Sequence, residues 1–110
     1  GKWWDIASLT ITSKGDPVEI TGGGPAKNTS SLFTREVVYR IYSSTDALEI
    51  GRTQESIPSS TTETVVLAVY SHKPAAGSHT YKLQGRQAGG GDDVDALAGC
   101  FILVREWRGK

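Results

Sequence analysis

Two segments of this sequence are apolar and lack the alternating polar residues expected in a sheet with one solvent-exposed face. They read Val-Val-Leu-Ala-Val-Tyr at residues 65–70 and Cys-Phe-Ile-Leu-Val-Arg-Glu-Trp at residues 100–107. Branched and aromatic residues favour strands, and successive side chains of a strand point to opposite faces of its sheet. One face of each strand must line the core of the protein, so something has to cover the other face.

The rest of the chain is cut into short pieces by turn-forming residues. Clusters of Gly, Pro, Ser and Asp recur along it, and no segment keeps the 3.6-residue apolar period of a helix. Short strands at this spacing predict an all-β fold of seven or eight strands, arranged as a sandwich or barrel. A chain of 110 residues fits a single domain over residues 1–110.

Alternating segments predict which side chains enter the core. Ala7, Leu9 and Ile11 alternate with Ser and Thr in the first strand, and Tyr81 and Leu83 are the inward candidates of a later one. Two glycine-rich stretches, residues 22–31 and 88–99, are expected to be flexible loops.

Charge and composition exclude several classes of partner. Twelve basic residues balance twelve acidic ones, which argues against a nucleic-acid-binding protein. No apolar run approaches the roughly 20 residues that span a bilayer, so membrane insertion is not expected. Cys100 is the single cysteine, so no internal disulfide can form, and we expect it to be a small buried apolar residue.

Four segments, in their order along the chain, carry a family resemblance. They are ASLTITSKGDPVEITGG, VVYRIYSSTDALEIG, KPAAGSHTYKLQGR and CFILVREW. Together they resemble the compact jelly-roll domains of the C1q/TNF-like type found in phage fibre, capsid-decoration and bacterial surface proteins. The Trp-Trp pair near the start and the acidic GGGDDVDA loop depart from that pattern. The resemblance implies an antiparallel jelly-roll β-sandwich that assembles as a homotrimer.

A trimer would explain the strands that are apolar on both faces. In such trimers one sheet faces the three-fold axis and packs against neighbouring subunits. The alternative, which the residues leave open, is a monomer in which loops or the other sheet cover these side chains. The expected trimer interface consists of Val38, Tyr42, Val66, Ala68, Tyr70, Ile102 and Val104.

Three tryptophans lie close to the two ends of the sequence. The first and last strands of the resembled architecture are neighbours, so we expect Trp3 or Trp4 to stack near Trp107 and anchor both ends. The alternative is that exposed tryptophan rings bind sugar.

No pattern of residues indicates an enzyme or a cofactor. The sequence lacks a GxSxG elbow, and no catalytic residue is assigned. His72 and His79 flank a turn and could approach each other, but a structural zinc site needs four ligands. We therefore expect no metal site, with one weak calcium candidate in Asp92, Asp93 and Asp95.

The sequence thus predicts a non-enzymatic display module on a virion surface or outside a cell. A phage fibre knob or a capsid decoration domain would contact host glycans or other virion proteins through its loops. The alternative is a monomeric carbohydrate-binding module of a secreted enzyme, which requires exposed aromatic residues. Candidate ligand contacts are Asn28, Thr29, Gln54, Asp92 and Asp93.

Overall fold

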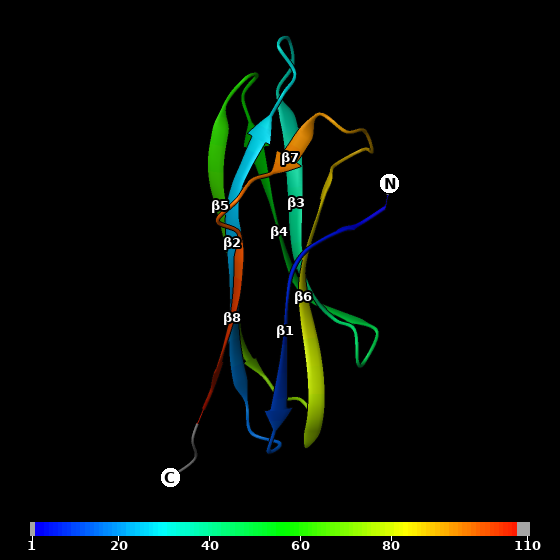
Figure 1. The fold of residues 1–110 in the computed structure, drawn as a ribbon, viewed down its shortest axis with the longest axis vertical. Coiled ribbons are helices and arrows are strands. Elements are labelled where there is room, and N and C mark those ends of the chain that lie inside the picture. Colours follow the sequence, from blue (N-terminus) through cyan, green and yellow to red (C-terminus); the bar gives the residue numbers. More distant parts are fainter. Residues whose placement is uncertain (1, 108–110) are drawn as a thin grey trace.

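The computed structural model describes residues 2–107 as a two-layered β-sandwich with no helix in that range (Figure 1). The expectation of an all-β sandwich is therefore confirmed. Among these residues there is accordingly no helix long and apolar enough to cross a membrane. The strands are β1 (Trp4–Ser13), β2 (Val18–Asn28), β3 (Arg35–Ser43), β4 (Leu48–Ile57), β5 (Thr62–His72), β6 (Gly77–Gln87), β7 (Val94–Ala96) and β8 (Phe101–Glu106).

The strands form two antiparallel sheets. Sheet A has the order β1-β6-β3-β4. Sheet B is built around β2, which pairs with β5 along one edge and with both β7 and β8 along the other. The strands follow the long axis of a molecule that measures 53 × 24 × 19 Å, and the unpaired edges of β1 and β8 lie on the same side of the sandwich (Figure 1).

The core lies between the two sheets and follows the predicted alternation. Ala7, Leu9 and Ile11 pack against it from β1, while the intervening Ser and Thr side chains are exposed. Tyr81 and Leu83 are fully buried on β6, as expected. The centre of the core is formed by Val18, Ile20, Val37, Tyr39, Ile41, Ile57, Val65, Leu67, Val94 and Ile102.

The first glycine-rich stretch is a strand, so the prediction of a loop over residues 22–31 is wrong for most of its length. β2 runs without interruption through Gly22, Gly23 and Gly24. A Cβ on Gly23 would lie 2.2 Å from the Val65 carbonyl oxygen, and one on Gly24 would lie 2.5 Å from the Cα of Cys100. The composition that usually marks a flexible loop here allows close approach between neighbouring backbones.

The second glycine-rich stretch is only in part a loop. Residues 89–91 adopt positive φ angles at a turn, but the short strand β7 follows and pairs with the end of β2. Val94 is 1% exposed, because it fills the core at this end of the sandwich. The acidic segment is thus held to sheet B.

β1 begins near the middle of the long axis whereas β8 ends at the bottom of the molecule, so the predicted stacking of Trp3 or Trp4 near Trp107 is wrong (Figure 1). β1 pairs with β6 and β8 pairs with β2, so the first and last strands are not hydrogen-bonded neighbours. The backbone nitrogen of Trp107 donates a hydrogen bond to the Pro17 carbonyl, 2.8 Å away, and Pro17 follows the end of β1 that is far from Trp4.

The close approach at Gly23 generates a stability prediction. Gly23→Ala should lower the free energy of unfolding by more than about 4 kcal/mol, because the methyl group overlaps the backbone of β5. Gly77→Ala is the matched control, since Gly77 also has a positive φ of 123° but nothing within 4 Å of its Cβ position. The control should lose only the backbone strain, about 1–3 kcal/mol. Urea unfolding monitored by circular dichroism measures both, and equal losses would contradict the close approach.

Candidate functional site

The outer face of sheet B carries exposed apolar side chains in register. Val66 and Phe101 flank Gly23 from either side, and Ala68 and Leu103 flank Thr21 in the next row. The apolar face is defined by five residues: Val66, Ala68, Tyr70, Phe101 and Leu103. Val66 is 50% exposed, Leu103 62% and Tyr70 68%, so the single chain covers little of this face.

The predicted interface residues of the last strand point the other way. Ile102 is 8% exposed and belongs to the core, and Val104 packs against the core beside it. Their neighbours Phe101 and Leu103 occupy the outer face instead. The apolar run of residues 100–107 does not reveal which alternate set faces outward, because both sets are apolar.

The remaining predicted interface residues, Val38 and Tyr42, lie on the outer face of sheet A. Their neighbours Val37, Tyr39 and Ile41 point into the core. Val38 is only 2% exposed, and it stands beside Arg86 in register. The long side chains of this face therefore cover Val38 within one chain.

The outer face of sheet A is organised by Trp3, which the sequence did not single out for this role. The guanidinium carbons of Arg40, Arg86 and Arg52 lie 4.1, 4.3 and 5.4 Å from the centroid of its ring. Arg40 also lies 4.4 Å from the ring of Tyr42. Cation–π attraction of this kind is worth about 0.5–1 kcal/mol at an exposed site.

Carboxylates and amides complete the polar layer on sheet A. Glu49 accepts hydrogen bonds from Arg52 at 2.9 and 2.6 Å, and the bond from Arg52 is the main reason that the pKa of Glu49 is lowered. Gln84 accepts from Arg40 at 2.8 Å and donates to Asp5 at 2.7 Å. Arg40, Arg52, Glu49 and Gln84 thus bond to one another on this face, in contrast to the exposed apolar side chains of sheet B.

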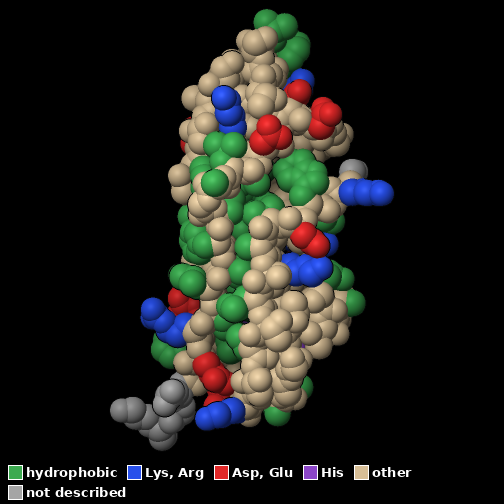
Figure 2. All heavy atoms as spheres, in the orientation of Figure 1, with side chains coloured by type: hydrophobic (Ala, Val, Ile, Leu, Met, Phe, Trp, Pro, Cys, Tyr) green, Lys and Arg blue, Asp and Glu red, His purple; other side chains and the backbone are tan. Residues whose placement is uncertain are grey.

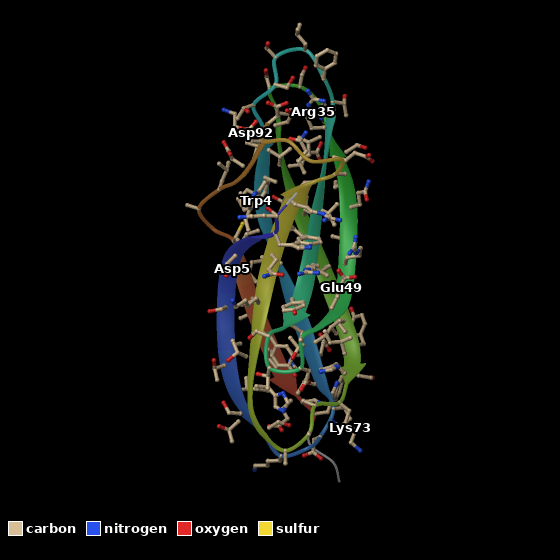
Figure 3. All side chains as sticks on the ribbon, turned by 90° about the vertical axis from the view of Figure 1, so that its right-hand side faces the viewer. Trp4, Asp5, Arg35, Glu49, Lys73 and Asp92 are labelled. Atoms are coloured by element: carbon tan, nitrogen blue, oxygen red, sulfur yellow. The ribbon has the colours of Figure 1, made fainter. Side chains whose placement is uncertain are left out.

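A groove of about 790 Å³ opens on the edge of the sandwich beside the start of β1. One wall is Trp4, Asp5 and Ile6, and the other is formed by Asp92 and residues 94–100. Figure 3 shows Trp4 and Asp5 on the edge strand, with Asp92 above them and Glu49 across the sheet. In Figure 2, hydrophobic side chains follow the seam between the two sheets, and acidic side chains gather at its upper part.

Asp5 is held in place at the mouth of the groove. It accepts a hydrogen bond of 2.7 Å from Gln84 and one of 3.1 Å from Lys82. These bonds keep the pKa of Asp5 below its usual value, and the bond from Gln84 has the largest effect. The side chain is therefore ionised at neutral pH.

The loop residues predicted to contact a ligand differ in how available they are. Asn28 is fully buried, where its amide nitrogen donates to the carbonyls of Phe33 and Ile57 at 2.8 and 2.9 Å. Its carbonyl oxygen accepts from the backbone of Ser30, so this side chain supports the fold and offers nothing to a ligand. The Thr29 hydroxyl donates to the carbonyl of Asp93 at 2.8 Å.

Two of the other three candidates are exposed, and the third is partly exposed. Gln54 lies on β4 rather than in a loop, and its side chain is exposed. Asp93 is partly exposed and accepts a hydrogen bond of 2.9 Å from Arg35, which ties the acidic segment to β3. Asp92 is exposed and lines the groove. Asp92 alone of the five combines exposure with a place in a concave site.

Residues 2–107 contain no group of three or more His, Cys, Asp and Glu side chains that could hold a metal ion. His72 and His79 instead flank the ring of Tyr81, at centroid distances of 5.8 and 6.4 Å. The Nε2 atom of His79 lies 2.8 Å from the carbonyl oxygen of Ala75. Burial raises the pKa of Tyr81 to about 12, so its phenol stays protonated.

Cys100 is partly buried beside the core. Its sulfur lies 3.8 Å from the hydroxyl of Tyr39 and 3.7 Å from the carbonyl oxygen of Pro25. It forms one end of the groove wall, and no basic residue among its described contacts would activate the thiol.

The comparisons with known proteins gave no match: no family model, no curated protein and no solved structure is similar to this chain. Inferences about function therefore depend on the surfaces described above.

The buried histidine cluster generates a pH prediction. Burial is the main cause that lowers the pKa of His72, so the folded protein disfavours the charged imidazole. The unfolded chain takes up this proton near pH 6.5, so the free energy of unfolding should be constant above about pH 7.5 and decrease as the pH falls through 6.5. His72→Gln should flatten this slope between pH 7.5 and 5.5 in urea unfolding. Parallel curves for the wild type and the variant would contradict the assignment.

Proposed function

We propose that this protein is a non-enzymatic display domain that associates with copies of itself through the apolar face of sheet B. The observation that carries the proposal is the exposure of Val66 and Tyr70 on β5 and of Leu103 on β8, the two strands that flank β2. Scattered exposed apolar residues are normal on a protein surface, but a contiguous patch marks an interaction site. Complete burial of one Val or Leu side chain stabilises an assembly by about 1.5–3 kcal/mol.

The charge at the rim of the apolar face favours a second copy as the partner. Glu19 and Arg105 are paired in register on the outer side of β2 and β8. They place one acid and one base beside the patch, and the whole chain has no net charge. Two copies can therefore meet at this surface without net repulsion, and opposite charges of the two rims can pair.

The strand pairing supports a shortened jelly roll as the architecture. β1 pairs with β6, β2 with β5 and β3 with β4, so three pairs are nested like one long folded hairpin. β6 also pairs with β3, which rolls this hairpin into two layers. Jelly rolls close two sheets in a related way. The number of three subunits comes from the resemblance to C1q/TNF-like domains.

A trimer would display three copies of the loops at each end of the sandwich. Leu32 and Phe33 are 79% and 57% exposed in the β2–β3 loop, at one tip of the long axis (Figure 1). Repeated loops gain avidity when the opposing surface repeats its ligands. We propose a virion surface or an extracellular location, with a host glycan or another virion protein as the ligand.

A monomeric carbohydrate-binding module is the second candidate function. The half-buried Trp4 in a groove with Asp92 favours it, because an indole ring can pack against a sugar ring. This function requires no association between chains, so the mass in solution separates the two candidates.

The proposal predicts the mass of the protein in solution. Light scattering should give three times the chain mass of 11.8 kDa for the wild type. Leu103→Glu should give a single chain, because a carboxylate in the interface loses its water without gaining a partner. Leu48→Glu is the control, since Leu48 is 53% exposed on β4 of sheet A, and it should remain a trimer.

A further variant locates the interface. Tyr42→Glu changes the outer face of sheet A and should leave the trimer intact. A wild type of one chain mass would overturn the display proposal. A trimer that Tyr42→Glu dissociates and Leu103→Glu does not would overturn the assignment to sheet B.

A further inference from the structure

The only charged side chains that line the groove beside β1, among the described residues, are acidic. Its lining includes three carboxylates, from Asp5, Asp92 and Asp95, and no basic side chain among the described residues that form it. A concave site of one sign concentrates ligands of the opposite sign. An anionic ligand would meet only repulsion there.

Two of the three carboxylates form no ion pair with another residue in the range 2–107. Lys82 lies 3.1 Å from Asp5, so that carboxylate is already compensated. Arg35 pairs with Asp93, which lies outside the groove. Asp92 and Asp95 are exposed and form no ion pair with any described residue. Lys27 stands opposite Asp95 in the strand register, so Asp92 carries the less compensated of the two charges.

The groove also has an apolar wall and an aromatic ring. Trp4 and Ile6 pack against the core and contribute one side, and Leu97 contributes the other at 37% exposure. The face of an indole ring attracts cations. A volume of about 790 Å³ lies within the range of roughly 300–1,000 Å³ that is typical of small-molecule sites, which is enough for one or two side chains of a partner.

We propose that this groove binds an Arg or Lys side chain on a short segment of a partner protein, together with an adjoining apolar residue of that segment. The cation lies between Asp92 and Asp95 and against Trp4, and the apolar neighbour contacts Leu97. The inference does not depend on self-association, because the groove lies on the β1 edge of the sandwich and the apolar face lies on the outside of sheet B.

A matched set of peptides tests the chemistry of the ligand. The probes are acetyl-Leu-Arg-Leu-amide and the same peptide with citrulline, which keeps the shape of arginine without its charge. Binding is followed by the amide shifts of Ala96, Leu97 and Gly99 in the NMR spectrum of the full chain. The arginine peptide should shift these resonances saturably, and the citrulline peptide should bind at least about fivefold more weakly.

A pair of isosteric variants tests the residues. Asp92→Asn with Asp95→Asn should weaken the arginine peptide about fivefold or more and leave the thermal midpoint unchanged. Asp16→Asn with Glu55→Gln is the control, because it removes the same charge from residues that neither line the groove nor form an ion pair with a described residue. The control should bind as the wild type does.

Three results would overturn the proposal. One is equal affinity for the arginine and citrulline peptides. Another is a larger saturable response of the same resonances to cellobiose, which would assign the groove to sugar. The third is a response to calcium alone that chelator reverses, which would assign the carboxylates to a metal ion. None of these results depends on whether the chain is a trimer.

Discussion

The central strand of sheet B depends on glycines that let two chain segments approach it closely. β2 pairs with β5 on one side and with β7 and β8 on the other, so every strand of this sheet is attached to it. A side chain at Gly23 would collide with β5, and one at Gly24 would collide with Cys100 at the start of β8. Without this close contact neither the apolar face nor the outer wall of the groove would form.

The outer faces of the two sheets differ in the side chains that they expose. On sheet A, three arginines surround Trp3, and two of them, Arg40 and Arg52, form ion pairs with Glu49. On sheet B, the residues of β2 beside Val66 and Leu103 are Gly23 and Thr21, which are too small to cover these apolar side chains. This asymmetry is why the proposed interface lies on sheet B, which also contains both segments that are apolar on their two faces, β5 and β8.

The sequence predicted the elements better than it predicted their surroundings. Alternation on β1 and β6 correctly placed Leu9, Ile11 and Leu83 in the core, because period two is a local property of a strand. It failed for residues 22–31, since glycine is equally typical of loops and of closely packed backbones. The sequence could not show that Ile102 faces the core and Leu103 faces outward, because both residues are apolar. It also could not predict the contact between Trp3 and Arg40, because these residues lie far apart in the sequence.

An intermolecular contact at Leu103 is the most direct test of the account. A sample that mixes chains with labelled leucine methyl groups and unlabelled chains reports only contacts between different molecules in a filtered nuclear Overhauser experiment. The account predicts cross-peaks from the Leu103 methyls to the outer face of sheet B on a neighbouring chain. The absence of these cross-peaks, at concentrations where the chains are fully associated, would contradict it.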